Sequence, residues 1–108
     1  MSRQSRTPAT RSGRPIVLLM DLLGRRWAMR VLWELREPAA SFRDLQARCD
    51  DISSSVLWQR VGELKEVGLV DAPERSGLRL TDSGNDLLES IRPLLAFAER
   101  WASGTPAA

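Results

Sequence analysis

Residues 52–70, ISSSVLWQRVGELKEVGLV, constrain the fold more than any other part of the chain. Ser53 is suited to begin a helix, because its hydroxyl can accept a hydrogen bond from a free backbone N–H of the first turn. Gly68 supplies the left-handed residue that commonly ends a helix, and two apolar residues follow at once, as in a strand. The apolar face of the predicted helix consists of Leu57, Val61 and Leu64, which recur at helical spacing.

A short polar-faced helix that is capped at both ends and leads into a strand is typical of the reading helix of a winged helix-turn-helix protein. The preceding segment agrees with this interpretation. Ser41 caps a helix over SFRDLQARC, with Asp44 three residues later as in a capping box. Asp50 and Asp51 form the turn into the Ser53 helix, and the two helices together make the helix-turn-helix unit.

The remaining segments predict two helices before this unit, and a wing and a helix after it. Pro15 begins a helix that Gly24 ends, and residues 25–37 form the next helix, which Pro38 closes. LVDA and LRL are short strands separated by PERSG, and Thr81 caps a long final helix. We therefore expect a mainly α fold with a small β wing, a winged helix-turn-helix.

The two terminal helices are the candidates for a dimer interface. The first helix is apolar on nearly every side, so other protein surface must pack around its whole circumference. In the last helix, apolar residues recur at 4-3-4-3 spacing, which is the pattern of a coiled-coil seam. Pro93 lies inside this helix and should cost about 3 kcal/mol or force a kink. Packing on the chain's own core explains this seam as well as dimerisation does, but the first helix favours a homodimer formed by both termini. The expected interface residues are Ile16, Leu19, Met20, Leu23, Leu87, Ile91, Leu94, Ala98 and Trp101.

The net charge of +2 is unevenly distributed. Residues 1–14 hold four arginines and no acid, which leaves 12 basic and 14 acidic residues in the remainder. We expect residues 1–14 to be a disordered basic arm, either simply solvated or bound to DNA phosphates, and residues 104–108 to be a disordered tail. Residues 15–103 would form the winged-helix domain, whose DNA affinity must come from a local basic face or from the arm.

The sequence contains no pattern that supports an enzymatic function. The chain has one cysteine, Cys49, and no histidine, so it offers no disulfide framework and lacks the commonest metal ligand and general base. We expect no catalytic residue, no metal and no cofactor. No apolar run is long enough to cross a membrane and no secretory signal is present, so we expect a cytoplasmic protein without a membrane partner.

The chain resembles the HxlR-type winged helix-turn-helix transcriptional regulators, relatives of the MarR-type repressors, over residues 15–101. The resemblance rests on DLLGRRW, SFRDLQ, the 52–70 segment, LRLTDSG and the final AERW, in this order. The first four segments are similar, in the same order, to the family's D-L-I-G-G-K-W, R-F-x-E-L, I-S-x-x-x-L-x-x-R-L-x-x-L-x-x-x-G-L-V and L-T-x-x-G. The resemblance implies a sequence-specific regulator that binds double-stranded DNA as a homodimer at a pseudo-palindromic operator.

Several features depart from the family pattern. Arg14 precedes Pro15 where many members have a cysteine that serves as a thiol sensor in some of them, so a redox role does not carry over. Cys49 is more consistent with a buried small hydrophobe. The wing is short. Trp58 and Gly62 occupy outward positions of the reading helix where relatives tend to have small polar and basic residues, respectively.

The candidate DNA contacts follow from chemistry. Gln59 can bond bidentately to adenine, and the serines at the start of its helix favour a phosphate. Arg60 could reach a phosphate or pair with Glu63. Trp58 could pack on a thymine methyl group or a sugar, or rest against a neighbouring element or a partner protein. The full set is Arg25, Arg26, Ser41, Arg43, Ser53, Ser54, Ser55, Trp58, Gln59, Arg60, Arg75 and Arg79.

The alternative function is a winged-helix module that binds protein and has weak or no DNA affinity. Three features favour this alternative: Trp58, Gly62 and the net negative charge of the chain after residue 14. We expect the other aromatic residues to lie in the core or the dimer interface rather than to stack on a ligand. The sequence reveals neither the operator nor a small-molecule effector.

Overall fold

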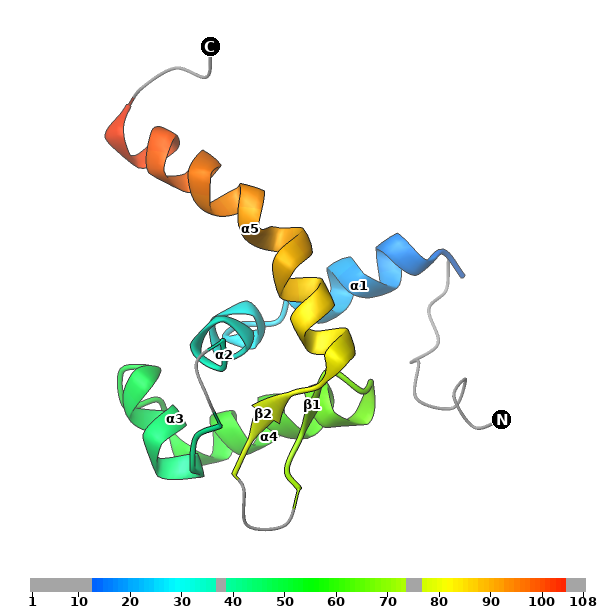
Figure 1. The fold of residues 1–108 in the computed structure, drawn as a ribbon, viewed down its shortest axis with the longest axis vertical. Helices are drawn as coiled ribbons and strands as arrows, with labels where there is room; N and C mark the ends of the chain where they lie inside the picture. Colours follow the sequence, from blue (N-terminus) through cyan, green and yellow to red (C-terminus); the bar gives the residue numbers. More distant parts are fainter. Residues whose placement is uncertain (1–12, 37–38, 74–76, 105–108) are drawn as a thin grey trace.

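A computed structural model of the chain describes residues 13–36, 39–73 and 77–104. Within these ranges the chain is mainly helical, with one small antiparallel sheet (Figure 1). This confirms the predicted winged helix-turn-helix class. The elements are α1 (Pro15–Leu23), α2 (Ala28–Glu34), α3 (Phe42–Arg48), α4 (Ser54–Glu66), β1 (Val70–Asp71), β2 (Arg79–Leu80) and α5 (Asp82–Ser103).

The three predicted helix caps are present. The Ser41 hydroxyl accepts from the backbone N–H of Asp44 at 3.0 Å, and the Asp44 carboxylate accepts from the N–H of Ser41 at 3.4 Å, which completes a capping box. Ser53 accepts from the N–H of Val56 at 3.3 Å. Thr81 accepts from the N–H of Gly84 at 3.0 Å and donates to the carbonyl of Gly68 at 2.6 Å. Each cap satisfies an N–H group that the helix itself leaves free.

The end of α4 is also as predicted. Gly68 has φ +82°, the left-handed conformation that glycine adopts without penalty. Its N–H donates to the carbonyl of Lys65 at 3.0 Å, and the N–H of Leu69 donates to the carbonyl of Leu64 at 2.9 Å. This pair of bonds is a Schellman motif, and it turns the chain from α4 into β1.

The predicted extent of the second helix was wrong. The prediction began it at Arg25, but α2 begins at Ala28, and Arg25 and Arg26 lie in the turn after α1. Trp27 has φ +77°, a left-handed conformation that an α-helix cannot contain, so it separates the turn from α2. The helix ends at Glu34, and residues 37–38, including Pro38, lie outside the described residues.

The core lies between α2, α3, α4, the sheet and the start of α5. Cys49 is fully buried within it, in agreement with its expected role as a small hydrophobe. The core includes the three inward residues of α4 and an apolar stripe along α2. Its buried members are Ala28, Val31, Leu32, Leu35, Leu45, Leu57, Val61, Leu64, Val70 and Leu88.

The sheet contains one pairing that the sequence did not predict. β1 and β2 pair antiparallel with Val70 opposite Leu80, as expected for the wing. In addition, Ala40 and Leu78 exchange backbone hydrogen bonds of 3.0 and 2.8 Å. The segment before α3 is thereby attached to the residue that directly precedes β2.

Only the first half of α5 packs on the body of the protein. Gly84 and Leu88 are buried, but every residue from Arg92 to Gly104 is exposed, and the helix extends away from the other elements (Figure 1). The helix continues through Pro93. No helix in the described ranges is long and apolar enough to cross a membrane.

Candidate nucleic-acid interface

The outward face of α4 is polar and open to solvent. Leu57, Val61 and Leu64 are almost completely buried, which fixes the rotation of the helix about its axis. Five exposed residues form the opposite face, and they include the two positions predicted to point outward, Trp58 and Gly62. The five are Ser55, Trp58, Gln59, Gly62 and Glu66.

The turn between α3 and α4 is rigidly built. Asp50 and Asp51 both adopt left-handed backbone conformations, with φ +59° and +58°. The Gln46 amide donates to the carbonyl of Ile52 at 2.8 Å and to the Ser54 hydroxyl at 3.3 Å. These bonds connect α3 to the start of α4, so the two helices present one surface. The sequence analysis did not identify Gln46 as part of this connection.

The first turn of α4 is available to an anion. Ser53, Ser54 and Ser55 are exposed, and Ser53 caps the helix. A helix N-terminus carries partial positive charge and free N–H groups, to which hydroxyl donors add hydrogen-bonding capacity. Ser41 and Arg43 lie at the exposed start of α3. Arg43 forms no ion pair with any described residue and is thus free to bind a phosphate.

Trp58 stacks on Phe42, the first residue of α3. The two ring centroids are 4.2 Å apart and the ring planes differ by 14°. This contact corresponds to one of the alternatives for Trp58, that it rests against a neighbouring element. Trp58 as a whole nevertheless remains 55% exposed.

Glu63 is neutralised by two arginines. The Nη1 of Arg60 donates to both oxygens of its carboxylate, at 2.8 and 3.0 Å. Arg25 approaches the same carboxylate at 3.4 Å, and the Gln59 amide lies 3.5 Å from it. The negative charge of Glu63 is therefore compensated within the candidate interface.

Arg60 also connects α4 to the turn that precedes α2. Its Nε donates to the carbonyl oxygen of Arg26 at 2.7 Å, and only 16% of its side chain is exposed. Of the two roles considered for Arg60, the structure shows the ion pair with Glu63. The contact also explains how Arg25 and Arg26, which are not on a helix, come to lie beside α4.

The wing contributes one described arginine. Arg79 pairs with Asp71 at 3.0 Å across the β1–β2 register, and both side chains are about half exposed. Arg75 lies outside the described residues.

The predicted dimer residues form exposed or partly exposed apolar surface on α1 and α5. Leu23 and Leu87 pack against the core and are half-buried, as are Leu19 and Ile91. Ile16, Met20, Leu94, Ala98 and Trp101 are exposed, and Trp101 reaches 74%. An apolar groove of about 270 Å³ runs between α2 and α5, lined by Met29, Trp33, Leu88, Leu94, Leu95 and neighbouring residues.

The described ranges contain no cluster of three or more potential metal ligands. Burial raises the pKa of the Cys49 thiol; nearby Arg30 opposes this shift. A thiol in this environment remains protonated and is a poor nucleophile. The site consists of hydrogen-bond donors, arginines and one aromatic pair, which suits binding rather than catalysis.

Comparison with known proteins gives a consistent result. A family model described as HxlR-like helix-turn-helix matches residues 22–105. The chain is 28% identical over 90 residues to YvaP of Bacillus subtilis (strain 168), named an uncharacterized HTH-type transcriptional regulator; the match covers 78% of this chain and 80% of that protein. It is 33% identical over 95 residues to the regulator Rv3095 of Mycobacterium tuberculosis (strain H37Rv). This match covers 82% of the chain but only 60% of that relative.

Solved structures show the same fold. A protein of Thermoplasma volcanium GSS1, described as a possible HxlR family transcriptional factor, matches with a TM-score of 0.73 and 26% identity over 83% of this chain and 86% of that one. Quinone-bound YodB of B. subtilis matches with a TM-score of 0.73 and 24% identity, covering 81% and 98% of the two chains. At that identity the likeness to YodB concerns the fold alone.

Proposed function

The chain belongs to the HxlR-like helix-turn-helix family of transcriptional regulators, and on that premise we propose that it binds a pseudo-palindromic operator as a homodimer. In this proposal α4 enters the major groove and the wing lies along the neighbouring backbone. The protein would act in the cytoplasm and use no cofactor.

The outward face of α4 is the observation that carries the proposal. It presents Gln59, whose amide can pair with adenine N6 and N7, next to an open helix N-terminus rich in serine. The nearest acid, Glu63, is held by Arg60 and Arg25 and does not project as a free charge. Apart from Glu66 at the last residue of the helix, the face offers hydrogen-bond donors rather than free negative charge, which favours a polyanion despite the net negative charge of residues 15–108.

Phosphate contacts would flank this face on both sides. Arg43 and Ser41 are exposed at the start of α3, and Arg26 is exposed in the turn beside α4. Arg79 would act from the wing, where its pairing with Asp71 is exposed and readily exchanged for a phosphate. Residues 1–12 lie outside the described residues, and their contribution as a basic arm stays a prediction.

The homodimer is supported by apolar surface that this chain leaves uncovered. Six large apolar side chains on the terminal helices are exposed, including Trp101 at 74% and Met20 at 62%. Exposed apolar patches on a small soluble domain mark association surfaces. The seam on α5 lies mostly beyond the part that packs on the body, so the chain's own core does not account for it.

The test is the salt dependence of binding to duplexes from the protein's own promoter region. With 6–10 phosphate contacts, affinity should fall by about 10³–10⁵ between 50 and 200 mM salt. Removing a phosphate contact with Arg43→Ala should make the slope of log K against log salt shallower by about 0.9 per subunit. Footprinting should show two protected half-sites related by two-fold symmetry. Undetectable or salt-insensitive binding would contradict the proposal.

The protein-interaction alternative is favoured by one observation, the 55% exposure of Trp58 on the outward face. It predicts that Trp58→Ala abolishes association with a protein partner while there is little DNA affinity to lose. A Trp58→Ala variant that loses DNA binding and keeps its protein contacts would exclude this alternative.

A further inference from the structure

Trp58 is the largest side chain on the outward face of α4, and its position is fixed by stacking. Phe42 covers one face of the indole in a nearly parallel arrangement, with centroids 4.2 Å apart. Phe42 itself packs against the hydrophobic core. The pair therefore forms a supported aromatic platform, of which the exposed part of Trp58 is the outer surface.

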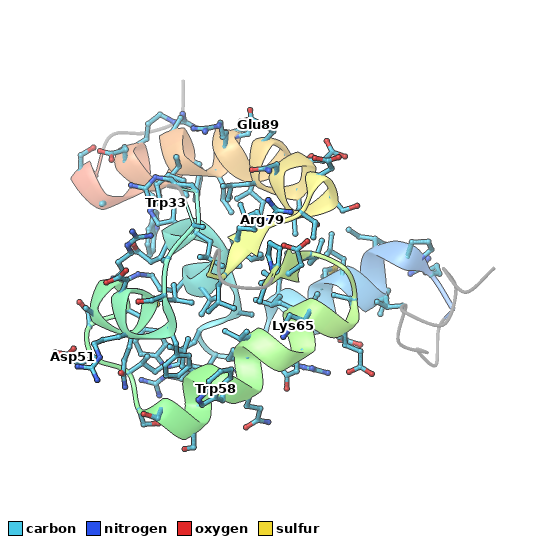
Figure 2. The ribbon with its side chains drawn as sticks, turned by 60° about the horizontal axis from the view of Figure 1, so that its bottom comes forward. Trp33, Asp51, Trp58, Lys65, Arg79 and Glu89 are labelled. Atoms are coloured by element: carbon cyan, nitrogen blue, oxygen red, sulfur yellow. The ribbon has the colours of Figure 1, made fainter. Side chains whose placement is uncertain are left out.

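The platform lies among the candidate DNA contacts. Ser54 and Ser55 precede Trp58 at the start of α4, and Gln59 follows it. Ser41 and Arg43 flank Phe42 at the start of α3. Figure 2 shows Trp58 on the outer side of α4. A duplex held by these phosphate contacts, with Gln59 at a base edge, would bring the major groove against the indole.

An indole surface selects for an apolar group. The described residues provide no hydrogen-bond partner for the Trp58 N–H and no cation over its ring. The apolar group that base pairs display in the major groove is the 5-methyl of a pyrimidine. A stacked ring also loses little side-chain freedom on binding, because Phe42 already restricts it.

We propose that Trp58 is a specificity-determining residue that recognises a pyrimidine 5-methyl group, that of thymine in the operator, and that Phe42 is its positioning residue. This inference rests on the proposed DNA-binding function and adds a base preference to it. Gln59 and Trp58 would then read neighbouring base pairs, one by hydrogen bonds and the other by apolar contact.

The experiment uses the full chain and a duplex selected from a random pool. Each thymine of the selected duplex is replaced in turn by uracil, which removes only the methyl group, and dissociation constants are measured by fluorescence anisotropy at fixed salt. One position in each half-site should lose about fourfold in affinity, the factor that corresponds to burial of one methyl-sized group. At that position a 5-methylcytosine·guanine pair should bind about fourfold tighter than a cytosine·guanine pair.

Variants then assign the effect to the platform. Trp58→Gln should abolish the difference between thymine and uracil duplexes, and Phe42→Leu should reduce it. Arg43→Ala is the matched control, since loss of a phosphate contact should weaken binding to both duplexes equally. Thermal unfolding shows whether each variant is folded. The base replacements are measured with the unmodified protein, so their result does not depend on any variant folding.

The outcomes distinguish this inference from the function on which it rests. If the unmodified protein binds thymine and uracil duplexes equally, or if folded Trp58→Gln keeps the ratio, the methyl assignment is overturned while DNA binding stands. An effect of uracil without an effect of 5-methylcytosine would also overturn it, because the methyl group would then not be the feature recognised. If no duplex is enriched from the pool, both proposals fail.

Discussion

Arg60 holds the carboxylate of Glu63 by two hydrogen bonds from Nη1, at 2.8 and 3.0 Å, while its Nε reaches the carbonyl oxygen of Arg26 at 2.7 Å. The ion pair lies within one helix, but the third bond spans 34 positions of the sequence. The arrangement both neutralises an acid on the candidate DNA-binding face and fixes the turn before α2 against α4.

Glu63→Gln should lower the free energy of unfolding by about 1 kcal/mol, because it removes the charged acceptor of a largely buried Arg60. Glu66→Gln is the matched control on the same helix. Glu66 is exposed and has no ion pair among the described residues, so its replacement should change stability by less than about 0.5 kcal/mol. Urea unfolding measures both. Equal effects of the two substitutions would contradict a structural role for the Arg60–Glu63 pair.

The sequence predicted what is encoded over short distances. Ser41, Ser53 and Thr81 cap helices through bonds to residues three positions away, and Gly68 ends α4 through bonds to its own last turn. Such signals depend only on neighbouring residues, so they can be read from the chain. The inward face of α4 was predictable for the same reason.

Contacts between distant segments were not predictable. Trp27 takes a left-handed backbone conformation that a residue with a side chain does not favour, so the second helix is shorter than predicted. The Ala40–Leu78 bridge joins the predicted LRL strand to Ala40, a residue with no strand signal of its own. The stacking of Phe42 on Trp58 depends on how α3 is placed against α4, so the aromatic part of the candidate site emerges only from the tertiary structure.

Gly84→Ala should be strongly destabilising. A Cβ at this position would overlap with the carbonyl oxygen of Leu69 and lie 3.2 Å from the Cβ of Leu80, so the start of α5 would have to move off the sheet. Overpacking of this severity should cost about 3 kcal/mol or more. Denaturant unfolding measures the loss. A variant as stable as the unmodified protein would show that α5 can shift without cost, contrary to the tight packing seen here.

Cys49 should make stability fall at alkaline pH. Burial raises the pKa of its thiol above the unfolded value of about 8.5. The folded state therefore binds the proton more tightly, and its contribution is fully present below the unfolded pKa and lost as pH rises through the folded pKa. The free energy of unfolding should decrease above about pH 8.5 more steeply in the unmodified protein than in Cys49→Ala. Parallel pH profiles for the two proteins would contradict this.

If the proposed homodimer forms through α5, Leu94→Glu should convert it to a monomer. Leu94 is 51% exposed on the half of α5 that extends from the body, so a carboxylate there is solvated in the monomer and buried only in the proposed dimer. Burying it should cost each subunit about 2 kcal/mol or more. Ser90→Glu adds the same charge to an exposed position of the same helix and is the control. Sedimentation velocity should show a monomer for the first variant and a dimer for the second.

Gly62→Ala should raise stability and lower DNA affinity. A Cβ at Gly62 would meet nothing within 4 Å, so no packing within the chain requires glycine there. Alanine in a helix interior should therefore stabilise the fold by about 0.5–1 kcal/mol. The position lies one turn after Trp58 on the outward face, where in the proposed complex the missing side chain would let the DNA approach the helix backbone. An added methyl group should obstruct that approach and weaken operator binding by about tenfold, or about 1.4 kcal/mol. Thermal unfolding and fluorescence anisotropy on the same preparation measure both effects, and a variant that gains stability with unchanged DNA affinity would show that the duplex does not come close to α4 at this turn.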